Sequence, residues 1–365
     1  MAVKISRLEV IAYRLPMNGS LQWGAHSKLS VAEHVLVRVH LENGIFGESE
    51  APPRPTIYGE TISSILGILQ HLSPILVGLE VEDTAGIANA LGSIPNNNTA
   101  KGALDMACWD ARAKHSGSSL FAQLAGPNRE LRVSYILGIN DQQTMLEEAR
   151  RVFTAGVRVL KVKVGRNHVR DLTVIRNLNL EFAGEMKLYA DSNETLTPET
   201  APKALEAMRD AGLMYVEEPL PVRQIKARAE LKRLNILPII SDDSSFTRAD
   251  LEREIDFDTF DILNIKTART GFTQSLEMLE LARKAGKGVM LGSQASTTLG
   301  TVHAALIASQ AGVTEASELS FFLKLEGEIT NKNLRLENGI LNLEQVEDVR
   351  VDPERLKAHG IPEDG

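Results

Sequence analysis

The chain has 365 residues, of which 43% are hydrophobic and 24% charged, a composition typical of globular domains rather than of a disordered chain. A formal net charge of −8 without basic runs disfavours a nucleic-acid partner, and no run approaches the roughly 20 apolar residues of a membrane span. The single cysteine, Cys108, excludes an intrachain disulfide and, with no signal-peptide pattern, predicts a cytoplasmic protein.

Residues 1–125 combine strand and helix patterns. Alternating segments rich in β-branched residues predict strands at 5–13 and 34–41, and a Glu-Asn-Gly turn leads into a third at 45–47. Helical spacing of apolar residues follows at 61–72, and a helix of small residues is predicted at 101–114. We expect this part to form an α+β domain.

From residue 131 onward, short apolar runs alternate with amphipathic helices. Eight repeats of this kind predict an α/β fold with a parallel sheet, which closes naturally into a barrel at this strand number. An open doubly wound sheet is the alternative, but the glycine-rich phosphate loop that would favour it is missing after the first strand. The runs lie at residues 133–139, 159–165, 186–192, 214–220, 237–243, 262–268, 288–294 and 315–321, with helices among them at 145–155, 198–211, 225–234 and 275–285.

Charged residues recur near the C-terminal ends of five successive predicted strands. They are Lys163, Asp191, Glu217, Asp242 and Lys266. Because the C-terminal strand ends of a barrel converge on one mouth, all five should surround a single cavity. The three carboxylates suit a hard cation such as Mg²⁺, or Mn²⁺, whereas no matching set of His and Cys residues favours zinc. Glu218 and Asp243, which follow two of these carboxylates, are predicted to be hydrogen-bond partners rather than ligands.

The lysines suggest proton transfer. Lys161 and Lys163 alternate on one strand and so face the same side of the sheet, and Lys266 approaches from across the mouth. An ammonium neighbour and a nearby dication both disfavour a charged lysine, so we expect a lowered pKa for Lys163. Such a lysine can move a proton at the α-carbon of a small carboxylate substrate, while the metal stabilises the enolate.

This set of residues resembles the enolase superfamily, specifically its muconate lactonizing enzyme subgroup. The Lys-x-Lys of 161–163, Asp191 in YADSN, Glu217 in VEEP, Asp242 in SDDS and Lys266 in NIKTARTGF follow the order of that subgroup over nearly the whole chain. The resemblance implies an N-terminal α+β capping domain (1–125), a modified TIM barrel of the (β/α)7β type (126–321) and a C-terminal segment (322–365) that returns to the capping domain. It also implies one Mg²⁺ held by the three carboxylates, with Lys163 and Lys266 as acid/base residues. We expect Lys161 to complete the catalytic set as a positive neighbour of Lys163 that also touches the substrate carboxylate.

Two segments of the first domain are expected to close the mouth as loops. Residues 17–30 contain Trp23, and residues 52–60 contain Arg54 and Tyr58. Arg54 would pair a distal substrate carboxylate bidentately, whereas interdomain packing explains Trp23 and Tyr58 equally well. The predicted substrate-binding set is Trp23, Arg54, Tyr58, Ser293 and Glu318, with Glu318 as a hydrogen-bond partner of a catalytic lysine or of the substrate.

Three functions remain open. The stretches 32–40, 50–61, 266–273 and 318–323 look most like anti-type muconate cycloisomerases, which convert cis,cis-muconate into muconolactone. The same enolate chemistry serves epimerases of dipeptides or N-acylamino acids and o-succinylbenzoate synthases, and two lysines flanking a cavity suit these as well. A non-catalytic barrel is the third reading. A homo-oligomer is expected.

Overall fold

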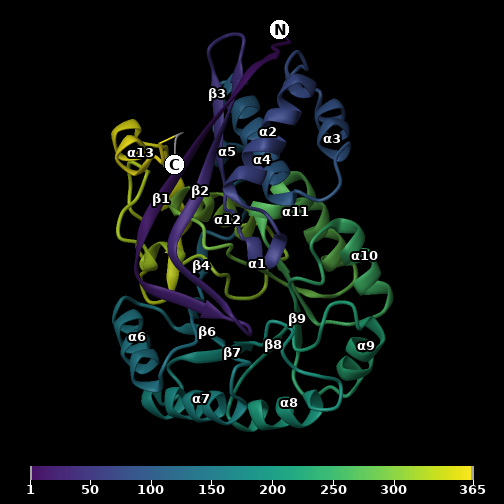
Figure 1. The fold of residues 1–365 in the computed structure, drawn as a ribbon, viewed down its shortest axis with the longest axis vertical. Coiled ribbons are helices and arrows are strands. Elements are labelled where there is room, and N and C mark those ends of the chain that lie inside the picture. The colour runs from purple at the N-terminus through teal and green to yellow at the C-terminus, as the bar shows by residue number, and fades with distance from the viewer. Residues whose placement is uncertain (1, 363–365) are drawn as a thin grey trace.

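The computed structural model describes residues 2–362. Figure 1 shows a strand-and-helix unit at one end of the molecule, followed by a ring of strand–helix repeats at the other end. The predicted α/β class, with a capping unit before a barrel, is confirmed by this arrangement. No helix in the described part of the chain is long and apolar enough to cross a membrane.

The N-terminal unit contains a three-stranded antiparallel sheet in the order β1-β2-β3. Its first two strands form one long hairpin, which ends in the pair Trp23 and Ser27 at its tip. Figure 1 shows this hairpin reaching from the capping unit down to the barrel. The strands are β1 (Ile5–Trp23), β2 (Ser27–Leu41) and β3 (Phe46–Ala51).

The length of this hairpin differs from the sequence-based expectation. The strand predicted at 5–13 continues to Trp23, and the loop predicted at 17–30 is wrong, because this segment forms the end of the hairpin. The pairing register shifts between Pro16 and Leu21. Proline has no N–H for the ladder, and the shift interrupts the alternation that marks a strand in the sequence.

Helices pack against one face of this sheet. The apolar core between them joins Val35 and Val37 of β2 to Leu69 of α2 and Ala107 of α4. Small residues let α4 approach β3 closely, since a Cβ on Gly47 would lie 2.1 Å from the carbonyl oxygen of Ala107. The helices are α1 (Pro55–Tyr58), α2 (Ile62–Leu76), α3 (Thr84–Gly92), α4 (Asn98–His115) and α5 (Leu120–Leu124).

Seven parallel strands form the second sheet, in which neighbours along the chain are also neighbours in space. All seven lie within the first seven apolar runs, so these strand predictions are confirmed. Their two faces are buried, as expected for a parallel sheet with helices outside. The strands are β5 (Tyr135–Leu137), β6 (Val159–Lys163), β7 (Lys187–Asp191), β8 (Val216–Glu217), β9 (Ile239–Ser241), β10 (Ile262–Ile265) and β11 (Gly288–Leu291).

The eighth predicted strand, at 315–321, does not form as a strand. A single parallel bridge joins Val133 to Ser317, and the N–H of Glu318 donates to the carbonyl of Leu291 at 2.7 Å. The Ser317 hydroxyl also accepts the N–H of Leu291 at 3.0 Å, so a side chain replaces part of the ladder. These contacts close the sheet, and the chain then turns into the 3₁₀ helix η1 (Phe321–Lys324).

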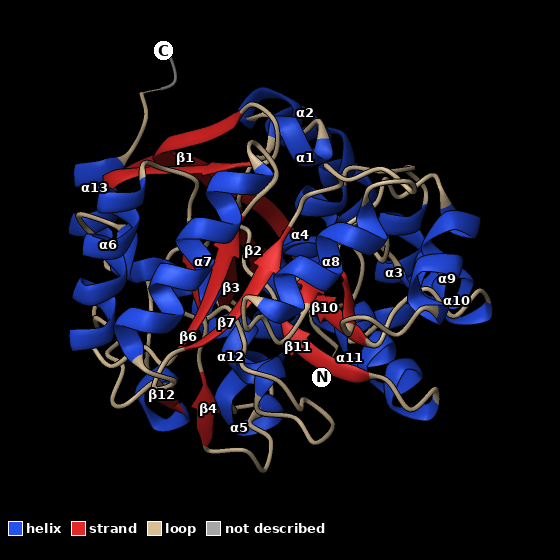
Figure 2. Cartoon of the chain, turned by 90° about the horizontal axis from the view of Figure 1, so that it is seen from below, coloured by secondary structure: helices blue, strands red, loops and turns tan. Residues whose placement is uncertain are grey.

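Helices surround the barrel sheet, as seen from outside in Figure 1 and from below in Figure 2. Helix α12 differs from the others because all its residues are buried. It lies between the barrel and the capping unit, which explains its apolar composition. The helices are α6 (Gln142–Thr154), α7 (His168–Phe182), α8 (Ala201–Asp210), α9 (Ile225–Arg233), α10 (Arg248–Asp256), α11 (Thr267–Lys284) and α12 (Thr298–Ala308).

The C-terminal part of the chain runs back along β1, as the yellow segment beside the purple strand shows in Figure 1. Isolated bridges join Met17 to Leu325 and Tyr13 to Gly360. Part of this segment also pairs across the N-terminal end of the barrel, where β12 lies antiparallel to β4. The remaining elements are β4 (Glu130–Arg132), β12 (Ile340–Asn342), the 3₁₀ helix η2 (Leu343–Val346) and α13 (Pro353–His359).

Candidate active site

Strand register brings the predicted charged residues together at the C-terminal mouth of the barrel, the end at which the parallel strands stop. Lys163 lies opposite Asp191 on the next strand, and Asp191 lies opposite Glu217 on the strand after that. Asp242 and Lys266 directly follow β9 and β10. Because partners in register point to the same face, these side chains meet inside the barrel.

Lys161 lies at the centre of this group and is 1% exposed. Its ammonium lies 2.9 Å from Asp191 Oδ2 and 2.6 Å from both Glu217 Oε1 and Glu318 Oε1. Burial acts to lower the pKa of Lys161, but the three carboxylates outweigh it and hold this pKa well above its usual value. Lys161 is therefore a fixed cation in this arrangement.

Lys163 and Lys266 form ion pairs with different carboxylates of the same site. Lys163 Nζ lies 2.5 Å from Asp191 Oδ2, and Lys266 Nζ lies 2.5 Å from Asp242 Oδ2. The lowered pKa expected for Lys163 stays a prediction, whereas the other two lysines of the site, Lys161 and Lys266, have raised pKa values. In both cases carboxylates raise the pKa against the effect of burial.

The position of the Lys266 side chain also depends on the close approach of the backbone at Gly292. A Cβ on Gly292, just after β11, would lie 2.8 Å from the Cγ of Lys266 and 2.2 Å from Asn264 Oδ1. A larger residue at position 292 would therefore push the lysine chain out of its place.

The carboxylates fit a hard cation by their chemistry. Asp191, Glu217 and Asp242 supply oxygen donors only, the ligand type that Mg²⁺ prefers. Glu217 Oε2 is buried and has no hydrogen-bond partner among residues 2–362, and the same is true of Asn264 Oδ1. The described residues contain no preassembled group of three or more side chains that could hold a metal ion, and lysine ammonium groups lie against these carboxylates. A cation held here would share their oxygens with the lysines.

The acidic residues that follow two of these carboxylates behave differently from them. Glu218 Oε1 accepts the N–H of Asp242 at 3.0 Å and the Ser244 hydroxyl at 2.6 Å, and burial raises the pKa of Glu218 to about 8. Asp243 Oδ1 lies 3.5 Å from a guanidinium nitrogen of Arg269. Both contacts agree with the predicted role of hydrogen-bond partners.

All five predicted substrate-binding residues line one cavity with the lysines. This cavity encloses about 40 Å³, and Trp23, Arg54, Tyr58, Ser293 and Glu318 take part in its wall. Glu318 accepts the N–H of Ser293 at 2.8 Å through Oε2, in addition to its contact with Lys161. Trp23, from the hairpin tip, also belongs to the interdomain apolar cluster. Trp23 therefore contributes both to the interdomain packing and to the cavity wall.

Arg54 is already engaged by the protein. It is 4% exposed, and its guanidinium donates to the carbonyl of Pro53 and, at 3.0 Å, to that of Ala295. His34 Nε2 lies 3.1 Å from the same Ala295 oxygen. A bidentate grip on a substrate carboxylate would require the guanidinium to release these carbonyls, so this role stays a prediction.

A buried carboxylate anchors the capping unit to the loop after β11. Glu50, at the end of β3, accepts the Tyr13 hydroxyl at 2.7 Å and the N–H of Thr297 at 2.9 Å. A Cβ on Gly300 would lie 2.3 Å from Glu50 Oε1, so the first turn of α12 packs directly on this carboxylate. Glu50 was not among the predicted site residues, and it lies beyond the strand predicted at 45–47.

Three further residues contact the predicted site residues but were not predicted from the sequence. Asn193 Oδ1 accepts from Lys163 at 3.1 Å, Arg269 Nη2 lies 3.1 Å from Asp242 Oδ1, and Asn264 Nδ2 donates to Glu217 at 3.3 Å. Each lies two or three residues from a predicted site residue in sequence or one strand away. Proximity to a strand end was the available signal, but it does not reveal which side chain turns inward.

Two protein-family models match the chain. The enolase C-terminal domain-like model matches residues 144–347, and the mandelate racemase / muconate lactonizing enzyme N-terminal domain model matches residues 9–126. The chain belongs to the enolase superfamily. The resemblance found in the sequence is thereby confirmed, and the ring of lysines and carboxylates lies in an enzyme of this superfamily.

Similar members of the superfamily include two kinds of enzyme. The L-Ala-D/L-Glu epimerase of Bacillus subtilis is 28% identical over 313 residues, covering 84% of this chain and 85% of the relative. A muconate lactonizing enzyme from Mycobacterium smegmatis, complexed with muconolactone, has a TM-score of 0.92 at 33% identity, covering 98% of this chain and 100% of the other. A dipeptide epimerase from Enterococcus faecalis, complexed with Mg and L-Leu-L-Tyr, has a TM-score of 0.87 at 26% identity, covering 94% and 97%.

Proposed function

We propose that this chain is a Mg²⁺-dependent cycloisomerase that converts cis,cis-muconate into muconolactone. The observation that carries the proposal is the pairing of two lysines, Lys163 and Lys266, with separate carboxylates of one buried cavity. Such a cavity provides a proton donor beside a cation site, which is what formation and protonation of an enolate require.

The carboxylates of Asp191, Glu217 and Asp242 are the proposed Mg²⁺ ligands. When bound, the ion supplies positive charge that stabilises the negative charge developing on a substrate carboxylate. Asn264 and Lys161 orient Glu217 through hydrogen bonds of 3.3 and 2.6 Å. These contacts fix the carboxylate before substrate arrives, which reduces the reorganisation needed during the reaction.

Lys163 is the proposed proton donor. In cycloisomerisation an oxygen of the distal substrate carboxylate forms a bond to a double-bond carbon, and the π electrons move toward the other carboxylate as an enolate. The Lys163 ammonium then gives its proton to the α-carbon. Hydrogen bonds to Asp191 and Asn193 hold the ammonium at the cavity wall. Lys266 contributes positive charge from the other side of the enolate.

The lining of the cavity favours a dicarboxylate over a dipeptide. The cavity wall carries the cations Arg54, Lys161, Lys163 and Lys266, which suit a substrate with two carboxylates. The rest of the wall includes the apolar residues Leu21, Leu29, Ile57 and Ile136. An unsaturated hydrocarbon chain matches this wall. The 33% identity to a muconate lactonizing enzyme supports the same choice.

Epimerisation of dipeptides or N-acylamino acids is the second candidate. It is favoured by the presence of a lysine on each side of the cavity, since epimerisation needs one group to remove the α-proton and another to return it on the opposite face. The epimerases among the similar proteins support it as well.

A substrate screen with Mg²⁺ separates the two candidates. Loss of the diene absorbance of cis,cis-muconate, with lactone formation, is the expected result. L-Ala-L-Glu and N-succinylamino acids would be followed in parallel by optical rotation and by α-deuterium uptake from D₂O. Epimerisation of any of these, with muconate unchanged, would replace the proposal by the second candidate. A matched sample treated with chelator should be inactive in either case.

A further inference from the structure

A second cavity lies at the N-terminal mouth of the barrel, the end at which the parallel strands begin. It encloses about 230 Å³, which is below the roughly 300–1,000 Å³ of pockets for drug-sized ligands. Val159 and Lys187, the first residues of β6 and β7, form one side, and Arg132 of β4 with Ile340 of β12 forms the other. The cavity therefore has the size for a small molecule and is separate from the candidate active site.

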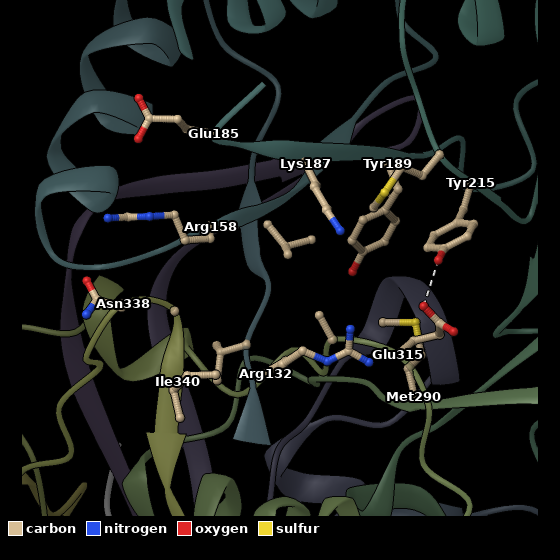
Figure 3. Close-up of a pocket in the computed structure, with 15 residues that line it drawn as sticks. Arg132, Arg158, Glu185, Lys187, Tyr189, Tyr215, Met290, Glu315, Asn338 and Ile340 are labelled. Atoms are coloured by element: carbon tan, nitrogen blue, oxygen red, sulfur yellow. Dashed lines mark hydrogen bonds between the residues drawn. The ribbon is translucent and has the colours of Figure 1, made fainter. Parts of the chain in front are cut away.

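Two cations point into this cavity. Figure 3 shows Lys187 entering from one side, next to Tyr189, and Arg132 from the other side. The Lys187 ammonium makes no hydrogen bond or ion pair with any of the described residues. The Arg132 guanidinium donates to the carbonyl of Thr314, which leaves further N–H groups for a ligand.

One carboxylate lines the cavity together with these cations. Glu315 accepts the Tyr215 hydroxyl at 2.7 Å, as the dashed line in Figure 3 shows. Glu185 points away from the cavity in the same view. Arg158 also points away, because its guanidinium lies 4.1 Å from the centre of the Phe153 ring. Two cations and one carboxylate therefore line the cavity, which leaves a net positive charge for an anion.

The floor of the cavity is aromatic and apolar. Tyr189 and Met290 are each 2% exposed and belong to one apolar cluster with Ile262 inside the barrel. Tyr215 packs at the edge of this cluster, with its ring 6.3 Å from that of Tyr189. A flat hydrocarbon body fits such a surface, since aromatic rings and thioether groups pack well against it.

We propose that this cavity binds a small aromatic carboxylate, with its anion between Lys187 and Arg132 and its ring against Tyr189 and Met290. The combination of a planar apolar floor with two cations against one carboxylate fits a monovalent organic anion better than inorganic phosphate, which would leave the floor uncovered. This cavity lies on the opposite side of Tyr189 from the candidate active site. The Tyr189 ring forms the wall between them, and its hydroxyl lies 3.3 Å from Glu318 Oε1 in the active site.

Calorimetric titration of the full chain with benzoate tests the proposal. Saturable binding is expected, and benzamide, which has the same shape without the charge, should bind much more weakly. Lys187→Gln should weaken benzoate binding at least roughly tenfold, the loss expected for a charge-assisted hydrogen bond. Lys203→Gln, on the outer helix α8, is the matched control and should leave the affinity unchanged. Thermal unfolding of both variants checks that they are folded.

Two further variants distinguish this cavity from the active site. Lys163→Ala alters the C-terminal mouth and should keep benzoate binding, whereas Ile340→Trp fills the N-terminal cavity and should abolish it. Benzoate binding that survives both Lys187→Gln and Ile340→Trp, or that disappears with Lys163→Ala, would place the ligand in the active site and overturn the proposal. Equal affinity for benzamide would overturn it too.

Discussion

The two mouths of the barrel use charged residues in opposite ways. At the C-terminal mouth, lysines and carboxylates are buried, each lies within ion-pair distance of another, and the free space is about 40 Å³. At the N-terminal mouth, Lys187 is exposed with no protein partner in the described chain, and the free space is about 230 Å³. Charges buried at high density must pair with one another, whereas a charge at an open cavity can be held by water.

The capping unit causes this difference. The hairpin of β1 and β2 and the Glu50 contacts cover the C-terminal mouth and exclude solvent from it. At the other mouth, the described residues include the short sheet of β4 and β12, which lines an open cavity.

Removal of one carboxylate from the C-terminal mouth should have the largest effect. Asp242→Asn should lower turnover at least roughly 10³-fold, because charge stabilisation by a metal ion amounts to several kcal/mol. Mg²⁺ titration by calorimetry should show weakened binding, with the circular dichroism spectrum unchanged. Asp243→Asn, at the adjacent position, is the control and should lose much less turnover. Full activity of Asp242→Asn would remove this residue from the ligand set.

Removal of the proposed proton donor, Lys163, should have the second largest effect. Lys163→Ala should lower kcat by about 10²–10⁴-fold, the range for loss of a general acid or base. In a cycloisomerase, Lys266→Ala should lower kcat less than Lys163→Ala does. In an epimerase, the two substitutions should lower kcat by about the same factor. Deuterium exchange at the α-carbon, measured in both variants, reports which face is used. Near-normal exchange in Lys163→Ala would contradict the proposed mechanism.

The same substitution in both mouths tests the comparison directly. Lys161→Met should lower the free energy of unfolding by about 3–5 kcal/mol in chelator-treated buffer, because three buried carboxylates lose their common cation. Denaturant unfolding measures this change. A loss below about 1 kcal/mol would mean that the C-terminal mouth does not depend on Lys161 for charge balance.

The matched change at the N-terminal mouth should have the smallest effect. Lys187→Met should alter the free energy of unfolding by no more than about 0.5 kcal/mol, as expected for an exposed side chain without a partner. The same denaturant series serves for both lysines. If Lys187→Met proved as destabilising as Lys161→Met, the proposed contrast between the mouths would be wrong.

Much of the barrel follows from the sequence. Seven of the eight predicted strand runs contain strands, and the five charged residues at their ends do lie at one mouth. The eighth run does not form a strand, because the Ser317 side chain takes over a backbone hydrogen bond. The division of the chain at residues 125 and 321, the roles of the site residues and the homo-oligomer remain predictions.

The sequence by itself determined what repeats along the chain. Strand and helix periods are local, and a polar residue at a strand end has a fixed direction relative to its neighbours. Strand order then follows chain order, so the meeting of Lys163, Asp191 and Glu217 could be predicted from spacing alone.

The tertiary structure alone decided the charge balance and the covering of each mouth. The pKa of Lys161 rises because Glu318, distant in sequence, completes a set of three carboxylates around it. The segment at 17–30 becomes a hairpin because it packs on the barrel, and a second cavity opens where Arg132 and Lys187 face each other. Electrostatic and packing energies depend on distances between residues far apart in the chain, which no local pattern contains.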